Sequence, residues 1–259
     1  MNLGIAGRKA IVCASSRGLG KACARALAEA GCEVVINGRD GKKLEATAAE
    51  LASTAGGKVI PVAADVATPE GQKALLAACP APDILVNNNA GPPFRDFREL
   101  SRQQLIDGVI ANMIVAIELI QKVIGPMTER KFGRIVNITS GTVKMPLAGL
   151  DLSSGARAGL TAFLAGVARS VADKNVTINN ILPGAFQTER LQSNLEHNAA
   201  QKGISVAEFA ATRMAAIPAK RFGQPDEFGA ACAFLCSAHA GYITGQNLLI
   251  DGGKFEGAF

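Results

Sequence analysis

Short apolar runs alternate along the chain with longer segments in which apolar residues recur every three or four positions. The apolar runs predict strands over 9–14, 33–37, 58–63, 83–87, 133–139, 175–181 and 246–250. Their continuous hydrophobicity is typical of parallel strands covered by helices on both sides. The longer segments predict helices near 18–30, 41–55, 69–78, 102–125, 152–173 and 225–237. This alternation predicts an α/β fold, a Rossmann-type doubly wound parallel sheet of about seven strands with helices on both faces.

The stretch 184–218 departs from this alternation. It contains a polar run, QTERLQSNLEHNAAQKG, followed by a helical segment over 206–217. Because ligands bind at the carboxyl edge of such a sheet, we expect this excursion to overhang the site as a substrate lid. A packed surface excursion is the alternative. No linker or repeat divides the chain, so residues 1–259 are expected to form a single domain.

Composition and charge narrow the classes of function. With 48% hydrophobic and 19% charged residues, the 259-residue chain can bury a large core. It has no run of about 18 apolar residues and no signal-peptide pattern, so we expect no membrane partner and a cytoplasmic location. Its six cysteines lie mostly in apolar runs, and with two distant histidines they predict no metal site. The net charge of +5 is scattered, which favours anionic small molecules or an acidic carrier protein over nucleic acid.

The turn after the first strand has the sequence expected for phosphate binding. It reads Ser15-Ser16-Arg17-Gly18-Leu19-Gly20 and leads directly into a helix. Glycine lets the backbone approach a pyrophosphate, and the helix N-terminus adds N–H groups and a positive dipole. Since the turn joins the first strand to the first helix, we predict a dinucleotide-binding loop; a tight structural turn is the alternative.

The end of the second strand bears on the choice of cofactor. NAD sites usually place an acid there to hold the ribose, and Gly38 stands at that position. Arg39 and Arg17 both suit a 2′-phosphate, because a guanidinium binds phosphate through paired hydrogen bonds. NADP(H) is therefore favoured over NAD(H). Two alternatives remain: both arginines are simply solvated, or Asp40 presents a carboxylate after a one-residue shift.

The order of motifs along the chain resembles that of the short-chain dehydrogenase/reductase family. That family's loop reads Thr-Gly-x-x-x-Gly-x-Gly; this chain has Cys13 and Ala14 in the first two places, and Ala14 is tolerable unless a positive φ is needed. The resemblance continues through Asp65-Val66, Asn88-Asn89-Ala90-Gly91, Asn112, Pro183-Gly184, Thr188, Gly245-Gln246 and Asp251-Gly252-Gly253. It implies that cofactor-binding positions include Asp65, Val66, Asn89, Ala90, Gly91, Pro183, Gly184 and Thr188.

The family's catalytic Ser-Tyr-Lys pattern is altered in this chain. Ser140 matches the serine, which implies binding of the substrate oxygen, and Asn112 matches the family's structural and catalytic asparagine. Counting on from Ser140 places Ser153 where the family has its tyrosine and Arg157 where it has the lysine that also holds the ribose. The only tyrosine in the chain is Tyr242.

These replacements change the available acid–base chemistry. A serine hydroxyl is a far weaker acid than a phenol with a pKa of about 10, and an arginine stays protonated. Hydride transfer at this site would therefore need another proton source. The candidates are a water held by Ser140, Ser153 and Asn112, or the side chains of Lys144 and Asp151 in the same loop.

Two functions fit this sequence. The first is an NADP(H)-dependent oxidoreductase resembling 3-oxoacyl-(acyl-carrier-protein) reductases, acting on a ketone or 3-oxoacyl-type substrate or the matching alcohol with a non-standard proton donor. The second is a catalytically inactive dinucleotide-binding sensor or scaffold. The presence of Ser140 and Asn112 favours the enzyme. Lys131 and Lys174 fall where such reductases present basic residues to an acidic carrier, with scattered surface charge as the alternative.

The resemblance also implies an apolar substrate mouth and a homo-oligomer. The mouth would be lined by Pro92, Pro93, Phe94, Leu147, Phe186 and Leu191. The helices predicted at 102–125 and 152–173 resemble those at the interfaces of family dimers and tetramers. Their apolar faces fit either an interface or the core; they include Val109, Met113, Leu160, Phe163 and Leu164. We expect a homotetramer, with a dimer as the alternative.

Overall fold

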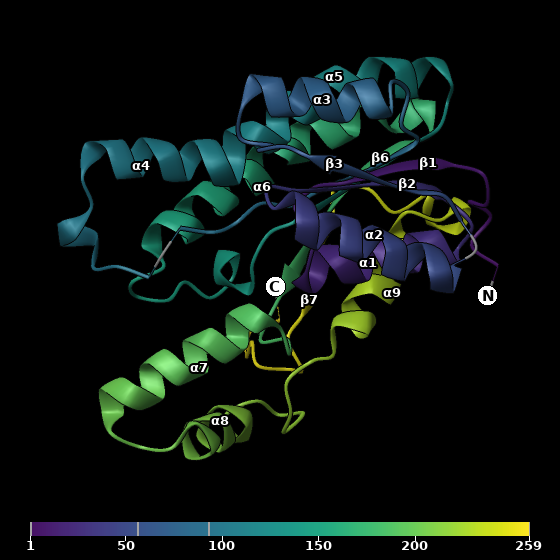
Figure 1. Cartoon of the computed structure of the whole chain (residues 1–259). Helices are drawn as coiled ribbons and strands as arrows, with labels where there is room; N and C mark the ends of the chain where they lie inside the picture. Colours follow the sequence, from purple (N-terminus) through teal and green to yellow (C-terminus); the bar gives the residue numbers. More distant parts are fainter. Residues whose placement is uncertain (1, 56, 93, 259) are drawn as a thin grey trace.

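The computed structural model, which describes residues 2–55, 57–92 and 94–258, is built around one seven-stranded parallel sheet (Figure 1). Its strands are β1 (Lys9–Val12), β2 (Glu33–Gly38), β3 (Val59–Ala63), β4 (Ile84–Asn87), β5 (Gly133–Ile138), β6 (Val176–Pro183) and β7 (Asn247–Ile250). They lie in the order β3-β2-β1-β4-β5-β6-β7. The strand order reverses between β1 and β4, which is where ligands bind in open α/β sheets. The predicted fold is confirmed.

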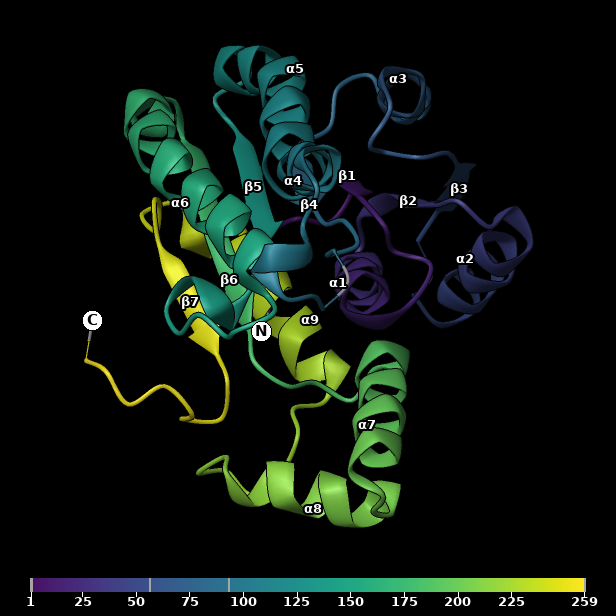
Figure 2. The same ribbon diagram turned by 90° about the vertical axis from the view of Figure 1, so that its left-hand side faces the viewer.

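Helices cover both faces of the sheet (Figures 1 and 2). One face carries α1 (Gly18–Glu29), α2 (Gly41–Ala55) and α9 (Pro225–Leu235); the other carries α3 (Pro69–Ala78), α5 (Val115–Glu129) and α6 (Asp151–Val171). Each layer has its own apolar core, with Leu27 and Phe228 buried in the first and Leu119 and Leu160 in the second. The sheet is therefore buried on both sides, as its uninterrupted apolar strands predict.

The long helix predicted at 102–125 is divided in the structure. It consists of α4 (Arg102–Val109), a π-helical segment (Ile110–Ile114) and α5. Within the π segment, Asn112 Nδ2 donates to the carbonyl oxygen of Gly108 at 3.3 Å. Such π segments recur at functional sites, because they redirect a side chain without ending the helix. By length and apolar composition residues 102–129 resemble a membrane span, but 44% of the most apolar window is buried inside the protein.

The excursion over 184–218 contains two helices, α7 (Glu189–Lys202) and α8 (Val206–Ala215), which project beyond the body of the sheet (Figures 1 and 2). The polar run forms a helix, α7, which the sequence analysis did not predict. The helix escapes detection because only Leu195 and Ala199 of α7 are buried, so no apolar stripe marks its period. Its ends are nevertheless well defined, by Thr188 as N-cap and by Gly203 with φ +65°.

Candidate functional site

The β1–α1 loop has the shape of a dinucleotide cradle. Gly18 has φ +57°, and a Cβ on Gly20 would lie 2.5 Å from the carbonyl oxygen of Ala14. Across the described residues, no side chain caps the start of α1, so its first-turn N–H groups can bind an anion. Ser15 is fully buried and accepts a 3.0 Å hydrogen bond from the backbone N–H of Asn37. The Ser15 side chain therefore fixes the loop to β2 and does not face the region bordered by Gly18, Gly38, Gly91 and Thr188, which we call the groove.

Ala14 occupies a backbone conformation that favours glycine. Its φ is +44°, which costs an L-residue about 1–2 kcal/mol. The turn is held from both sides: Asn37 Oδ1 accepts from the Ala14 N–H at 3.2 Å, and Asn88 Nδ2 donates to its carbonyl oxygen at 3.1 Å. β1 accordingly ends at Val12, two residues earlier than predicted, because the left-handed turn cannot continue a strand.

The end of β2 offers no free acid to a ribose. A Cβ on Gly38 would lie 3.1 Å from Ser16 Oγ, so a larger side chain there would press on the phosphate loop. Asp40 Oδ1 accepts from the backbone N–H of Lys43 at 3.1 Å, at the start of α2. Because this carboxylate is engaged as a helix cap, the one-residue shift that would have favoured NAD(H) has no support in the geometry.

Basic side chains surround the same end of β2. The Arg39 side chain is 76% exposed, and its Nη1 lies 4.0 Å from Asp65 Oδ2. The Arg17 side chain is 64% exposed, and its Nη1 bonds Glu189 Oε2 at 2.9 Å. Val66, which the family resemblance places among the cofactor-binding positions, is instead buried in the core. Two exposed guanidinium groups therefore lie near the end of β2, where the sequence predicts that a 2′-phosphate is bound.

The loop after β4 forms the opposite wall of the groove. Asn89 Nδ2 donates to the Ala111 carbonyl oxygen at 3.2 Å, and its Oδ1 accepts from the N–H of Ala90 at 2.8 Å. A Cβ on Gly91 would lie 3.1 Å from the guanidinium of Arg190. The sequence reading missed Arg190, which α7 brings from the excursion to this loop. In the sequence, the signal that could have indicated Arg190 is its place two residues after Thr188 in the polar run.

Thr188 and the end of β6 complete the groove. Thr188 caps α7, since its Oγ1 accepts from the N–H of Leu191 at 3.2 Å. Its Cγ2 lies 3.7 Å from where a Cβ on Gly18 would stand. Pro183 ends β6, and a Cβ on Gly184 would lie 2.7 Å from the Cα of Asp251. The predicted Pro183-Gly184 and Thr188 positions therefore lie between the phosphate loop and the C-terminal segment.

Ser153 and Arg157 form a buried pair on one face of α6. They are one helical turn apart, and Arg157 Nε donates to Ser153 Oγ at 3.2 Å. Arg157 Nη1 also donates to the carbonyl oxygen of Ile138 at 2.7 Å. Ile138 ends β5, two residues before Ser140, so this contact brings the α6 pair to the strand end that carries Ser140. Burial, with a smaller contribution from Arg190, lowers the pKa of Arg157 to about 10, which leaves it protonated at neutral pH.

The hydroxyl of Ser140 is oriented by Thr142. Ser140 Oγ accepts hydrogen bonds from the Thr142 N–H at 3.1 Å and from Thr142 Oγ1 at 2.9 Å. A serine hydroxyl has one hydrogen and two acceptor lone pairs. With both acceptor positions engaged, the Ser140 hydrogen is left to donate to a substrate oxygen.

A small cavity of about 20 Å³ lies between the Asn112 segment and Arg157. Asn112 Oδ1 and Asn87 Oδ1 are buried acceptors without a hydrogen-bond partner in the described part of the chain, and both residues line this cavity. A cavity of this size holds about one water, which can donate to two acceptors. The site thus contains a place suited to one bound water beside the guanidinium.

Four asparagines form a continuous hydrogen-bonded row across β4, β5, β6 and β7. Asn87 Nδ2 donates to Asn137 Oδ1 at 2.9 Å, Asn137 Nδ2 to Asn180 Oδ1 at 3.0 Å, and Asn180 Nδ2 to Asn247 Oδ1 at 2.8 Å. The four residues are directly opposite one another in the strand register. This row, which we call the asparagine ladder, joins the four strands and ends at the cavity.

Comparison with known proteins identifies the family. A family model described as enoyl-(acyl carrier protein) reductase matches residues 13–254. The 3-oxoacyl-(acyl-carrier-protein) reductase FabG of Vibrio cholerae serotype O1 is 32% identical over 257 residues, covering 98% of this chain and 99% of that protein. The chain belongs to the short-chain dehydrogenase/reductase family. The predicted family is confirmed.

Other members of the family share the fold closely. The NADPH-dependent reductase BacG of Bacillus subtilis is 30% identical over 254 residues, covering 96% of this chain and 98% of that protein. The structure of L-sorbose reductase from Gluconobacter frateurii, complexed with NADPH and L-sorbose, matches with a TM-score of 0.94 at 28% identity, covering 99% of this chain and 100% of that one. A variant of actinorhodin polyketide ketoreductase with NADPH matches with a TM-score of 0.91 at 28% identity, covering 97% and 98%. The predicted preference for NADP(H) agrees with the cofactors named for these relatives.

Some residues expected at the site on family resemblance lie elsewhere. Phe186 is buried and packs edge-on against Phe228, with ring centroids 5.3 Å apart. It lines a cavity of about 160 Å³, but the lining of this cavity does not include Ser140, Ser153 or Arg157. Leu191 packs with the apolar residues beneath the excursion. Phe94 and Leu147 are exposed, as a mouth requires. Pro92 is half-buried, and Pro93 lies outside the described residues.

The charged residues that the sequence offers as proton donors or carrier contacts also have other partners or positions. Lys144 Nζ lies 5.4 Å from the centre of the Phe255 ring, and Asp151 Oδ2 accepts from the Gly149 N–H at 2.9 Å, so both have partners other than the two serines. Lys131 and Lys174 precede β5 and β6 and therefore lie at the amino edge of the sheet, opposite the site. Carrier docking at the site through these two lysines is not supported.

Proposed function

We propose that this chain is an NADP(H)-dependent oxidoreductase that reduces a ketone or 3-oxoacyl-type substrate, or oxidises the matching alcohol. The main support is that Ser140 and the Ser153–Arg157 pair converge at the carboxyl edge of the sheet, beside a glycine-rich loop flanked by arginines. The family relatives point the same way, since several are named as NADPH-dependent reductases or ketoreductases.

The residues present fit the dinucleotide. The uncapped start of α1 and the close approach at Gly20 provide a backbone cradle for the pyrophosphate. Arg17 and Arg39 would hold the 2′-phosphate, and Arg157 the nicotinamide ribose. When bound, the cofactor supplies or accepts the hydride.

The side chains of the site then handle the substrate oxygen. Ser140 donates its free hydrogen to that oxygen. The Ser153 hydroxyl, polarised by the hydrogen bond from Arg157 Nε, donates a second one. The fixed positive charge of Arg157 stabilises the developing alkoxide, as preorganised donors do in other sites. Because neither group is acidic enough to supply the proton, we assign that role to a water held by Asn112 Oδ1 and by the remaining acceptor position of Ser153 Oγ. Ser140 cannot hold this water as well, since both of its acceptor positions are filled by Thr142 and its hydrogen goes to the substrate.

We extend the proposal to the organisation of the protein. Residues 1–259 form one domain, with 184–218 as the substrate lid, and the protein works in the cytoplasm as a homotetramer or dimer. Val109 and Phe163 are exposed on α4 and α6, whereas Leu160 and Leu164 are buried in the core. The exposed pair supports an interface formed by these helices, since large exposed apolar side chains gathered on neighbouring helices mark contact surfaces.

The test is NADPH oxidation by purified protein with a panel of ketones and 3-oxoacyl thioesters. Turnover with at least one substrate supports the enzyme, and Ser140→Ala should then lower kcat/KM by about 10²–10³-fold, as loss of an oxyanion donor does. The affinity for NADPH should not change. Loss of NADPH affinity in the same variant would mean that Ser140 serves the cofactor and not the substrate.

The alternative is a sensor or scaffold that binds the dinucleotide without catalysis. It is favoured by one observation, the presence of Ser153 and Arg157 where the family's tyrosine and lysine are expected. Tight NADPH binding without turnover on any substrate, and with the same NADPH affinity in Ser140→Ala, would select this alternative.

A further inference from the structure

The first turn of α7 lies across the dinucleotide groove. Three consecutive residues face three walls of it: Thr188 lies over the phosphate loop at Gly18, Glu189 bonds Arg17, and Arg190 reaches the loop after β4. The segment that we propose as the lid is therefore joined to the cofactor groove by charged side chains, and not only by apolar packing.

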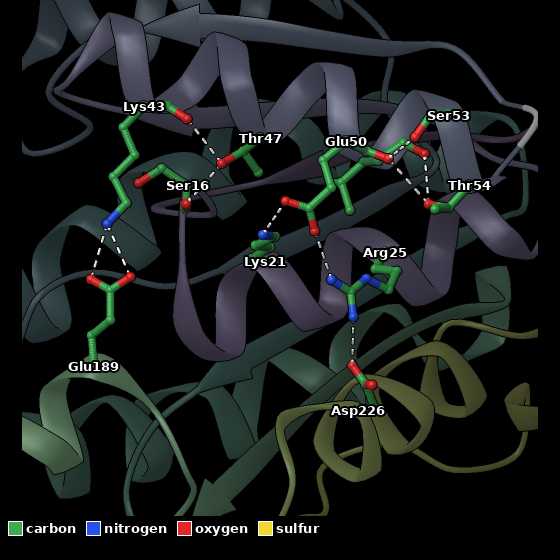
Figure 3. A network of polar contacts seen from close by, with 11 residues as sticks. Ser16, Lys21, Arg25, Lys43, Thr47, Glu50, Ser53, Thr54, Glu189 and Asp226 are labelled. Atoms are coloured by element: carbon green, nitrogen blue, oxygen red, sulfur yellow. Dashed lines mark hydrogen bonds and ion pairs between the residues drawn. The ribbon is translucent and has the colours of Figure 1, made fainter.

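The carboxylate of Glu189 is held by two cations from different elements. Lys43 Nζ donates to both of its oxygens, at 3.0 and 2.9 Å (Figure 3), and Arg17 Nη1 donates to Oε2 at 2.9 Å. Hydrogen bonds from Lys43 and Arg17 lower the pKa of Glu189, so it is ionised at neutral pH. Lys43 and Arg17 thus form an anion-binding pair whose ligand is a carboxylate of the chain itself.

Lys43 stands at the place where a 2′-phosphate would be read. It lies in the first turn of α2, five residues after Gly38, and its backbone N–H is fixed by Asp40. Thr47 Oγ1 donates to the Ser16 carbonyl oxygen at 3.0 Å and ties α2 to the phosphate loop (Figure 3). The base of Lys43 is therefore held in place while its long side chain can turn.

We propose that Lys43 joins Arg17 and Arg39 in binding the 2′-phosphate of NADP(H), and that Glu189 competes with this phosphate for Lys43 and Arg17. Cofactor binding then releases the first turn of α7 and frees the lid. This inference rests on the proposed function. It adds Lys43 as a determinant of cofactor specificity and Glu189 as the group that couples the cofactor to the lid.

The exchange of ligands is physically reasonable. The Glu189 side chain is 58% exposed, and those of its partners are 64% and 39% exposed; exposed ion pairs of this kind are weak. A phosphate monoester carries close to two negative charges and three acceptor oxygens. It therefore offers more to the two cations than one carboxylate does, and the three side chains are free to rearrange.

The first experiment measures the dissociation constants of NADPH and NADH by fluorescence titration. Lys43→Met should weaken NADPH about tenfold and leave NADH within about twofold, because only NADPH carries the 2′-phosphate. Glu189→Gln should tighten NADPH about threefold or more, with a smaller effect on NADH, and this gain should shrink in the double variant. The matched control is Asp226→Asn, which breaks the 3.1 Å ion pair with Arg25 on the same side of the molecule (Figure 3) and should change neither constant.

The second experiment follows the lid without turnover. Hydrogen exchange of the amides in the first turns of α7 should accelerate when adenosine 2′,5′-bisphosphate is added, and should not respond to adenosine 5′-monophosphate. If the variants bind NADPH and NADH in the wild-type ratio, or the two nucleotides act alike, competition by Glu189 is wrong while the proposed function stands. If the wild type binds neither dinucleotide, the proposed function fails and the inference fails with it.

Discussion

Replacing Ala14 by glycine should stabilise the protein, because this residue has φ +44°. An L-residue in the left-handed region costs about 1–2 kcal/mol, and a glycine loses about 0.5–1 kcal/mol more backbone entropy than alanine on folding. The net gain is about 0.75 kcal/mol at the midpoints of these two ranges. For a chain of 259 residues, an unfolding entropy of about 2.1 cal/mol/K per residue turns this gain into a rise in Tm of about 1–2 °C.

The opposite substitution in the same loop provides the matched control. Gly18 has φ +57°, and the nearest atom to a Cβ built on it is Thr188 Cγ2 at 3.7 Å, an ordinary contact. Gly18→Ala therefore tests backbone strain without a steric clash, and should lower Tm by about 1–2 °C by the same arithmetic.

The assay is thermal unfolding followed by circular dichroism, on protein freed of nucleotide, because a bound ligand adds its own stabilisation. Urea denaturation of the same three proteins gives the free energies of unfolding at 25 °C. If Ala14→Gly lowers Tm while Gly18→Ala does not, the strain assigned to this loop is absent. If both substitutions raise Tm, the loop does not hold the left-handed conformation in solution.

Three further outcomes follow from the geometry. The six cysteines are all buried and free, and burial raises the pKa of Cys13 to about 12. Ellman's reagent should therefore label no cysteine in the native protein and six after unfolding, and fast labelling of the native protein would contradict this packing. Hydrogen bonds from Arg221 lower the pKa of Glu227 from 4.5 to about 2, so the stabilising contribution of this carboxylate is present above pH 4.5 and is lost as the pH falls towards 2. The difference in Tm between wild type and Glu227→Gln should therefore shrink between pH 4.5 and pH 2, and a constant difference would contradict this pKa shift. Asn180→Val interrupts the asparagine ladder and removes a partner of the buried Asn137 amide, which should cost about 1–3 kcal/mol in urea unfolding. Asn198→Ala removes a half-buried side chain that donates to the Asn194 carbonyl oxygen of the same helix, and should change stability by less than about 0.5 kcal/mol.

The sheet and its order could be predicted because parallel buried strands leave uninterrupted apolar runs. The ends of strands were less predictable: β6 continues to Pro183 because it pairs with Ile250 of β7, a partner that no local pattern reveals. α7 was missed for the opposite reason, since a helix that buries only Leu195 and Ala199 has almost no apolar signature.

Some residues of the candidate site could likewise be predicted from the sequence, and others could not. Ser140, Ser153 and Arg157 could be placed by spacing, because motif distances along a strand and a helix survive folding. The contact between Lys43 and Glu189 could not, since it joins residues 146 positions apart through the packing of an excursion on α2. The burial of Phe186 is of this kind too, because its partner Phe228 belongs to α9.

The asparagine ladder has an electrical consequence for Arg157. Every amide in the row points the same way, from the exposed Asn247 inward, so the carbonyl end of the last one, Asn87, faces the cavity that Arg157 also lines. Four aligned dipoles polarise one another and present partial negative charge to a guanidinium that, within the described residues, forms no ion pair. Polar side chains of the strands thus take the place of water in stabilising the charge of the buried Arg157.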